Sequence, residues 1–261
     1  MASKYTKLLS QARVLVLGGS SGIGFSVAEH ALELGAIVTI SSSRTSKLDS
    51  ALERLRGAVP DAAQSVNGQV CDLSDPNTTR ENLESMLQTI TKTKPLDHIV
   101  FTAGDGIKIQ PVGDFEVSAL QKLGNVRFIA PALLGGLAAK YMNVARTSSI
   151  TFTSGTGGHR PAKNWTAVAG YCSGLEGLAR GLAVELAPIR VNTVSPGAVH
   201  TEMFSEIPED RLERVLAGFR DRTLTKSVGT PEELSEAYIY FMRCSYATGS
   251  LVEVNGGTLL A

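Results

Sequence analysis

Short apolar segments alternate with longer helix-like segments along the whole chain, and this alternation restricts the fold more than any other feature. The strand-like segments are Val14–Leu17, Ile37–Ile40, Ser65–Val70, Ile99–Thr102, Ser149–Thr153, Val191–Val194 and Leu251–Val254. Segments with helical periodicity lie between them: Ile23–Leu34, Leu48–Arg56, Thr78–Thr91, Val117–Tyr141, Ala167–Leu186 and Glu232–Met242. Each helix must return the chain over the sheet with the same hand, so this order predicts a parallel sheet with helices on both faces. We therefore expect a doubly wound α/β fold of about seven parallel strands, with residues 1–261 forming a single Rossmann domain.

The composition is that of one soluble globular domain. The chain has 261 residues, 43% of them hydrophobic, and its 25 basic side chains balance its 25 acidic ones. No charge excess directs it to nucleic acid or to a membrane surface. Its three cysteines form no CxxC pair and its four histidines have no metal-ligand spacing, so neither a disulfide framework nor a metal site is expected. With no signal-peptide pattern and no apolar span, we predict a cytoplasmic protein that acts on a small molecule.

The first strand-like segment leads into a glycine-rich turn that opens the first helix. Glycines at such a junction allow a tight turn and a close approach of the backbone to phosphate, which the helix N-terminus then holds. A plain glycine turn is the alternative. The position at the first strand–helix junction favours dinucleotide binding, with residues 18–24 as the phosphate loop. The predicted binding residues are Gly18, Ser20, Ser21, Gly22, Ile23 and Gly24.

The end of the second strand indicates which nucleotide binds. An NAD site usually has an acidic residue here, whereas a 2′-phosphate requires a cation and hydroxyl donors. This chain has Ser42, Ser43 and Arg44 at the strand end, and Lys47 follows. A solvated basic turn is the alternative interpretation. We predict NADP(H), with Ser43 and Arg44 as binding residues.

The spacing G-x-x-x-G-x-G resembles that of the short-chain dehydrogenase/reductase family, and further matches follow in order along the whole chain. They are Asp72-Leu73, Ala103-Gly104, Asn125, Ser154, Arg190-Val191-Asn192, Pro196-Gly197 and Val254-Asn255-Gly256-Gly257. The resemblance implies catalytic roles for Ser154 and Asn125 and a homodimer or homotetramer formed through the fourth and fifth helices. It also implies a set of further cofactor-binding residues: Asp72, Leu73, Ala103, Gly104, Pro196, Gly197, Val199 and Thr201.

The sequence departs from this family at the catalytic Y-x-x-x-K motif. Alignment on the segment Leu175–Leu178 puts Val168 at the tyrosine position and Cys172 at the lysine position. Tyr171 would have Leu175 at its lysine position, so we interpret it as a core or interface residue. For Cys172, a reactive thiol and a buried apolar filler are both considered, and the filler is favoured. Because valine cannot donate a proton, ordinary carbonyl reduction is disfavoured.

Other polar or aromatic residues are expected near the nicotinamide end of the cleft. Asp105 follows Ala103-Gly104 and is a candidate to stabilise a cation or carry a proton, with a simple turn residue as the alternative. Arg127 and Trp165 are candidate substrate residues, with surface and core packing as the alternatives. On a helix, the offset of two directs Arg127 away from the face of Asn125. His159 and Arg160 lie in a loop that either borders the pocket or is only a surface loop.

The lost dyad, together with Asp105, Arg127 and Trp165, resembles atypical fungal family members such as the reductase/Diels–Alderases of indole alkaloid pathways. This resemblance implies an NADPH-dependent oxidoreductase of specialised metabolism that transfers hydride to an iminium or another activated acceptor. A cyclase or isomerase that retains the cofactor and a non-catalytic nucleotide-binding regulator are the alternatives. Residues 199–222 interrupt the regular alternation, and we expect them to form a substrate lid with an amphipathic segment over 206–222, or otherwise a solvated helix.

Overall fold

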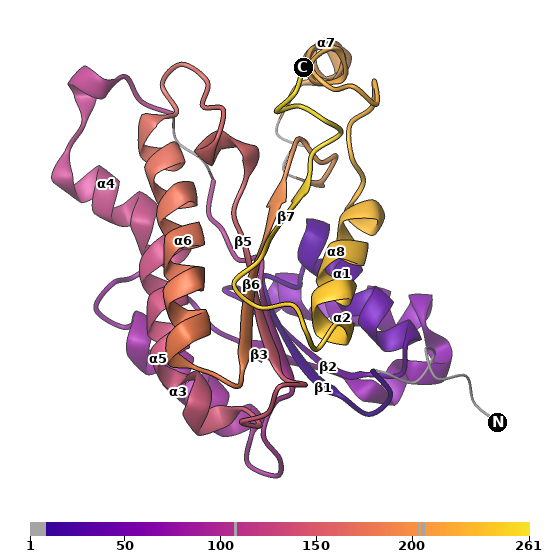
Figure 1. Cartoon of the computed structure of the whole chain (residues 1–261). Helices are drawn as coiled ribbons and strands as arrows, with labels where there is room; N and C mark the ends of the chain where they lie inside the picture. Colours follow the sequence, from indigo (N-terminus) through magenta and orange to yellow (C-terminus); the bar gives the residue numbers. More distant parts are fainter. Residues whose placement is uncertain (1–8, 107–108, 203, 205–206) are drawn as a thin grey trace.

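A single parallel sheet forms the centre of the molecule (Figure 1). The computed structural model describes residues 9–106, 109–202, 204 and 207–261. Its 7-stranded sheet has the order β3-β2-β1-β4-β5-β6-β7, and every neighbouring pair is parallel. The strands are β1 (Arg13–Leu17), β2 (Ile37–Ser42), β3 (Val66–Val70), β4 (His98–Phe101), β5 (Ser149–Thr153), β6 (Arg190–Pro196) and β7 (Leu251–Val254). The predicted doubly wound α/β fold is therefore confirmed.

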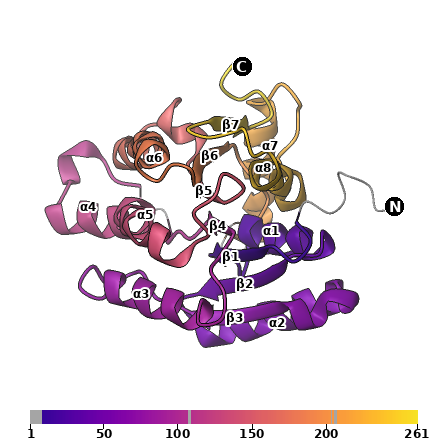
Figure 2. The ribbon, with the colours of Figure 1, turned by 60° about the horizontal axis from the view of Figure 1, so that its bottom comes forward.

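Helices cover both faces of this sheet (Figure 2). One layer is formed by α1 (Gly22–Glu33), α2 (Thr45–Ala58) and α8 (Pro231–Arg243). The other contains α3 (Thr79–Ile90), α4 (Val117–Gly124), α5 (Ala130–Tyr141) and α6 (Thr166–Glu185). Short 3₁₀ turns occupy Pro60–Ser65, Val112–Asp114 and Thr156–Gly158. None of the described helices is long and apolar enough to cross a membrane.

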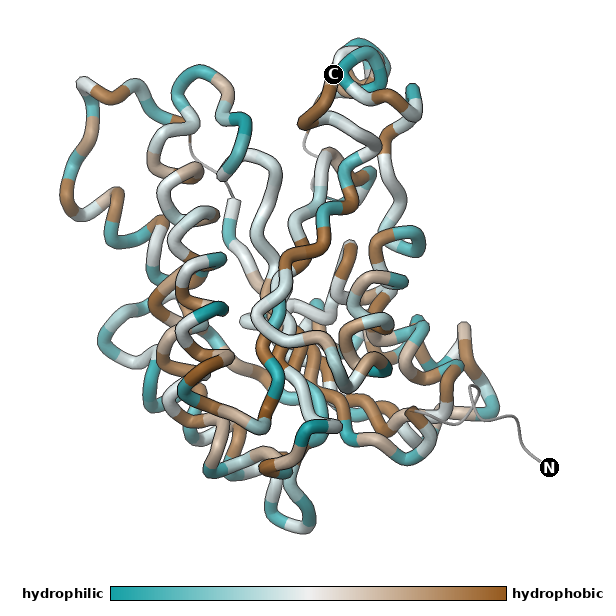
Figure 3. The backbone as a smooth tube through the Cα atoms, in the orientation of Figure 1, coloured by the Kyte–Doolittle hydropathy of each residue, from teal (hydrophilic) through white to brown (hydrophobic). Residues whose placement is uncertain are grey.

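The continuous apolar character of the strands follows from burial on two sides. In β1, Val14 and Val16 pack into the core beneath α1 and α8, whereas Leu15 and Leu17 pack into the core on the opposite face. Successive side chains of a strand point to opposite faces, so a sheet covered twice requires an unbroken apolar run. Hydrophobic residues are accordingly concentrated along the central strands (Figure 3).

The predicted helix over 117–141 is interrupted. Between α4 and α5 the chain forms a π-helical turn, Asn125–Ile129, in which the N–H of Ala130 donates to the carbonyl of Asn125 five residues earlier. The wider turn changes the rotation of the side chains that follow it, and π turns are common at functional sites. A helical hydrophobic pattern cannot reveal this turn, because the period on either side stays that of an α-helix.

The predicted lid contains a helix, α7 (Glu209–Asp221), in the part of 199–222 that the structure describes. Residues 203 and 205–206 of this segment lie outside the described residues. In Figure 1, α7 lies at the upper end of the molecule. Phe219 of α7 and Phe204 pack edge to face with 5.9 Å between ring centroids, and both line the cleft described below.

Candidate functional site

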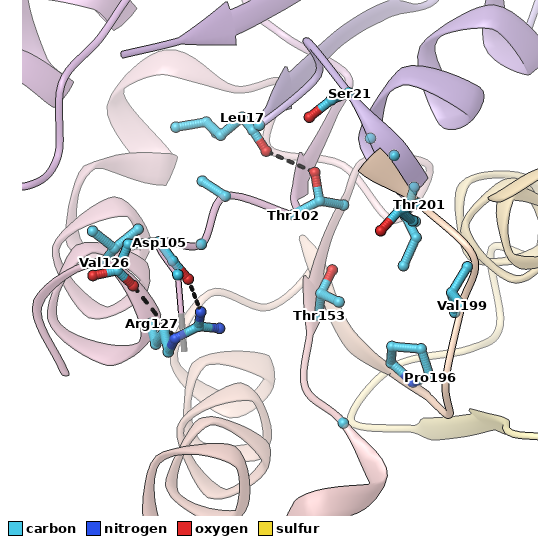
Figure 4. A pocket seen from close by; sticks show the side chains of 18 of the residues that line it. Leu17, Ser21, Thr102, Asp105, Val126, Arg127, Thr153, Pro196, Val199 and Thr201 are labelled. Atoms are coloured by element: carbon cyan, nitrogen blue, oxygen red, sulfur yellow. Dashed lines mark hydrogen bonds and ion pairs between the residues drawn. The ribbon is translucent and has the colours of Figure 1, made fainter. Parts of the chain in front are cut away.

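A cleft of about 780 Å³ lies at the carboxyl ends of the strands. From β1 the chain first adds β2 and β3 on one side and then β4 to β7 on the other, so the direction of the strand order reverses at β1. Open α/β sheets bind their ligands at such a reversal. The cleft is lined by the loops that follow β1, β2, β3, β4, β5 and β6, and Figure 4 shows part of this lining. Residues that are far apart in the sequence therefore meet here because all parallel strands end at one edge.

The phosphate loop is closely packed against the loop after β4. A Cβ atom at Gly24 would lie 2.3 Å from Thr102 Oγ1 and 2.4 Å from the carbonyl oxygen of Gly18, so no larger residue fits without movement. The Thr102 hydroxyl in turn donates to the carbonyl of Leu17 at 3.0 Å, as Figure 4 shows. Gly18 has φ +84°, in the left-handed region that glycine adopts readily. These contacts place the N-terminus of α1 towards the cleft, where its backbone N–H groups can hold an anion.

The far end of the cleft is rich in hydroxyl and basic groups. Ser42 receives a hydrogen bond from the Ser20 hydroxyl at 3.1 Å, which ties the end of β2 to the phosphate loop. Ser43, Arg44 and Lys47 are exposed at the same end of the cleft. Asp72 accepts a hydrogen bond from the Ser74 N–H at 2.9 Å, which shapes the turn after β3. This end of the cleft therefore offers donors and positive charge to an anionic group.

All residues predicted to bind the cofactor line this one cleft, from the phosphate loop to the loop after β6. They are Gly18, Ser20, Ser21, Gly22, Ile23, Gly24, Ser43, Arg44, Asp72, Leu73, Ala103, Gly104, Pro196, Gly197, Val199 and Thr201.

The α6 face next to the cleft carries Val168 and Cys172, which are separated by about one helical turn. Val168 is buried, and burial is the main reason that the pKa of the Cys172 thiol is raised. Cys172 therefore stays a neutral thiol near pH 7. Tyr171 points elsewhere: its hydroxyl donates to the carbonyl of Leu120 in α4 at 2.9 Å, and it is not among the cleft residues. This position agrees with the packing role expected for Tyr171.

Asp105 and Arg127 form a pair at the cleft wall, as Figure 4 shows. The Nε atom of Arg127 lies 3.5 Å from Oδ1 of Asp105, and Arg127 Nη2 also donates to the Asp105 carbonyl. The guanidinium lies over Gly104, where a Cβ atom would come within 3.1 Å of Nη1. Trp165 also lines the cleft, beside Gly157. The structure thus brings all three of these candidates to one cleft.

Asn125 does not face the cleft. Its side chain is buried and donates to the carbonyl of Leu73 at 2.7 Å and to Thr79 Oγ1 at 2.9 Å. It joins the π-helical turn to the loop after β3, so the catalytic contact expected of its side chain is not supported by this geometry. Arg127, two residues later, points into the cleft instead. The two side chains diverge as the helical offset predicts, and Arg127, the candidate substrate residue, is the one that lines the cleft.

Ser154 lies at the end of β5 and lines the cleft, as expected. Its hydroxyl donates to Glu176 Oε1 at 2.7 Å, and the carboxylate of Glu176 also contacts His159 Nε2, which lies 3.0 Å from Oε2. Glu176 is only 6% exposed. His159 is not among the residues that line the cleft and is connected to it through Glu176, which accepts from Ser154. Arg160 donates to the carbonyl of Thr258 near the C-terminus.

Sequence reasoning missed Glu176. The residue appeared only as part of the segment that aligns α6, although its spacing carries a usable signal. It follows Cys172 by four residues and Val168 by eight, which places it on the same helix face. Among the described residues, no group of His, Cys, Asp and Glu is arranged to hold a metal ion.

Comparison with known proteins identifies the family. A model of the SDR-like Rossmann domain matches residues 5–261. The short-chain dehydrogenase/reductase fsr5 of Gibberella fujikuroi is 41% identical over 260 residues, which cover 99% of this chain and 98% of that protein. The short-chain dehydrogenase/reductase malC of Malbranchea aurantiaca is 40% identical over 254 residues, covering 97% and 96%.

Solved structures agree with this assignment. The MalC reductase/Diels–Alderase from Malbranchea aurantiaca has a TM-score of 0.94 at 40% identity and covers 98% of this chain and 99% of its own. A small-chain dehydrogenase in complex with NADPH has a TM-score of 0.76 at 26% identity, covering 97% and 100%. With its phosphate loop, its cleft and these relatives, the chain belongs to the short-chain dehydrogenase/reductase family of oxidoreductases.

Proposed function

We propose that this chain is an NADPH-dependent oxidoreductase of specialised metabolism that transfers hydride to an iminium or a similarly activated acceptor. The observation that carries the proposal is the composition of the cleft. The predicted dinucleotide-binding residues all line it, and so do Val168 and Cys172 of α6, which our alignment puts at the family's proton-donating tyrosine and its lysine. Under this proposal the protein retains the site for the cofactor but lacks the tyrosine that normally donates the proton.

The choice of NADP(H) rests on the end of β2. The Arg44 guanidinium and the Ser43 hydroxyl are exposed at the cleft, and no acidic residue lies in 40–44. Ser20, Ser21, Gly22, Ile23 and Gly24 would hold the phosphates, and the bound nucleotide would supply the hydride. A relative at 26% identity is known as a complex with NADPH.

A cationic acceptor suits the remaining groups. Reduction of a ketone places negative charge on oxygen, and an acid normally neutralises it. Hydride transfer to an iminium carbon yields a neutral amine, and no new anion forms. Asp105 and Arg127 would orient the substrate through their paired polar groups, and Trp165 offers a flat surface for an aromatic ring.

Cyclisation is a second candidate activity. The observation that favours it is the 40% identity to the MalC reductase/Diels–Alderase over nearly the whole chain. A cleft of about 780 Å³ is large enough to position a polycyclic substrate, and positioning alone accelerates an intramolecular reaction. From the sequence and its family resemblance we also propose alkaloid-type substrates, a cytoplasmic location, and a homodimer or homotetramer that buries α4 to α6. We also propose that the domain is single and that residues 199–222 cover the substrate.

The first test is a titration with NADPH and NADH of the wild type, Arg44→Ala and Arg56→Ala. Arg56 lies on the same helix, about 18 Å from Arg44 by helical rise, and is a matched control. We expect Arg44→Ala to weaken NADPH binding by about tenfold or more, because a charge-assisted contact to the 2′-phosphate is lost. NADH binding and the Arg56→Ala protein should be unaffected. An equal loss for both nucleotides contradicts the NADP(H) proposal.

The second test follows NADPH consumption and product together, with cyclic imines as substrates. Oxidation of NADPH in proportion to amine formed supports the reductase. Product formation without NADPH consumption supports the cyclase. Protein that binds neither nucleotide contradicts the proposed function as a whole.

A further inference from the structure

Ser154, Glu176 and His159 form a connected group at the wall of the cleft. Ser154 lines the cleft, Glu176 lies behind it on α6, and His159 lies in the loop after β5. Glu176 is 6% exposed, whereas the His159 side chain is 36% exposed. A buried carboxylate is costly unless it is paired and hydrogen-bonded, and here it has two partners. These contacts hold the three side chains in one defined arrangement at the wall of the cleft.

The geometry fixes the direction in which the Ser154 proton points. A hydroxyl carries one proton, and Ser154 donates it to Glu176 Oε1 at 2.7 Å. The other partner of Ser154 Oγ is the carbonyl of Cys172 at 3.4 Å, which is also an acceptor. Both contacts draw the proton away from the cleft. The lone pairs of Ser154 Oγ are left for the substrate.

We propose that Glu176, held by His159, makes Ser154 a hydrogen-bond acceptor towards the substrate, so that the site selects a protonated C=N group over a C=O group. Glu176 and His159 are positioning residues in this scheme. The inference rests on the proposed reductase function and adds the substrate's chemical class: an iminium that carries an N–H.

The reaction balances without an added acid. The iminium N–H donates to Ser154 Oγ, and hydride from NADPH forms a C–H bond at the iminium carbon. The electron pair of the C=N π bond becomes the nitrogen lone pair, so the products are a neutral secondary amine and NADP⁺. A ketone oxygen would instead need a donor as it becomes negative. The Ser154 proton is committed to Glu176 and Val168 has none to give, so neither of these residues can donate to that oxygen.

The test compares three flat bicyclic probes of nearly equal size with the NADP⁺-loaded protein. They are protonated dihydroisoquinoline, which has an N–H, the N-methyl dihydroisoquinolinium cation, which has none, and α-tetralone, which has a carbonyl. Trp165 is the only tryptophan of the chain and lines the cleft, so its fluorescence reports binding directly at the site. The rates of NADPH-dependent reduction of the same probes provide a second measurement.

We expect the wild type to bind protonated dihydroisoquinoline about tenfold more tightly than either other probe, the ratio for one hydrogen bond to a charged donor. Glu176→Leu removes the acceptor and frees the Ser154 proton to turn towards the cleft. Glu176→Gln keeps the shape and offers an N–H₂ group. Glu176→Leu should lose the preference, and its reduction of α-tetralone should rise relative to the imine, whereas Glu176→Gln, whose amide carbonyl can still accept from Ser154, should retain part of it. Glu185→Gln, an exposed change on the same helix, should behave like the wild type.

A second pair of variants tests the role of His159. His159→Gln retains a donor for Glu176 and should keep the preference, whereas His159→Leu should weaken it. A purely structural role would lower all rates together and leave the ratio unchanged. Equal ratios in the wild type and Glu176→Leu overturn the inference, as does the absence of any probe response in protein that binds NADP⁺. If NADPH binding and imine reduction persist with unchanged ratios, only this inference fails. If the wild type binds no NADPH, the proposed function itself fails.

Discussion

A carboxylate of the protein occupies the anion-binding end of α1, and its removal should strengthen cofactor binding. Glu202 Oε2 accepts a hydrogen bond from the N–H of Gly22 at 2.8 Å, and Gly22 is the first residue of α1. Its other oxygen lies 3.7 Å from Arg54. A free N–H at this helix end is the group that would hold a cofactor phosphate. Glu202 must therefore leave this position, or remain as a like charge beside the phosphate, when the dinucleotide binds.

The size of the effect follows from Coulomb's law and the exposure of the side chain. Two unit charges 4 Å apart repel by about 1 kcal/mol in water and about 4 kcal/mol at an effective dielectric constant of 20. The Glu202 side chain is 51% exposed, so solvent screening brings the repulsion to the lower end of this range. We expect Glu202→Gln to lower the dissociation constant of NADPH by roughly five- to tenfold, since about 1.4 kcal/mol corresponds to tenfold. The glutamine carbonyl can still accept from Gly22.

The assay is a fluorescence titration of NADPH at low and high salt. Glu33→Gln is the control, because Glu33 lies at the other end of α1, about 16 Å away by helical rise. The gain in Glu202→Gln should shrink as salt screens the partly exposed charge, and Glu33→Gln should show little gain at any salt concentration. Unchanged or weaker NADPH binding by Glu202→Gln refutes the reasoning, because the carboxylate would then not compete with the phosphate.

Three further changes test the structure and the site. Burial lowers the pKa of His98 to about 4, below the unfolded value of about 6.5, so the unfolded chain takes up the proton first and acid reduces stability between these pH values. His98→Asn should remove up to about 1.4 kcal/mol per pH unit of this dependence in urea unfolding. Tyr238→Phe deletes a buried hydroxyl that lies 2.8 Å from Thr153 Oγ1, and should cost about 1 kcal/mol in the same assay. Val168→Tyr combined with Cys172→Lys restores an acid next to the cofactor and should raise α-tetralone reduction by about 100-fold, measured as NADPH oxidation.

The fold was predictable because the central strands are buried on both faces. Val14–Leu17 is unbroken in its apolar character since neighbouring residues pack into different cores, and the same holds for Ile99–Phe101 of β4. The cofactor cleft was predictable for a related reason. Glycines such as Gly24 have a local steric cause, and the loops that follow parallel strands must meet at one edge.

The orientation of side chains around the π-helical turn was not predictable from the sequence. Asn125 and Arg127 were expected to diverge, and they do, but a periodic pattern gives only their relative directions. Which one faces the cleft depends on the extra residue in the turn and on the partners that bury Asn125, Leu73 and Thr79. Both partners lie more than forty residues away in the chain. A tertiary contact, and not a local preference, therefore decides which residue faces the cleft.

The position of Glu176 was predictable from the sequence, but its burial and its partners were not. Its helical spacing from Val168 and Cys172 placed it on the face that borders the cleft, but spacing gives no information on burial or on a partner. The structure supplies both, since the carboxylate is covered and lies between Ser154 and His159. Its charge also helps to raise the pKa of the Cys172 thiol, after burial, so the residue at the lysine position stays neutral. In the usual family arrangement this position is a cation that supports a proton donor. Here a neutral thiol stands near a buried carboxylate, and under the proposed function this arrangement would favour a substrate that brings its own positive charge.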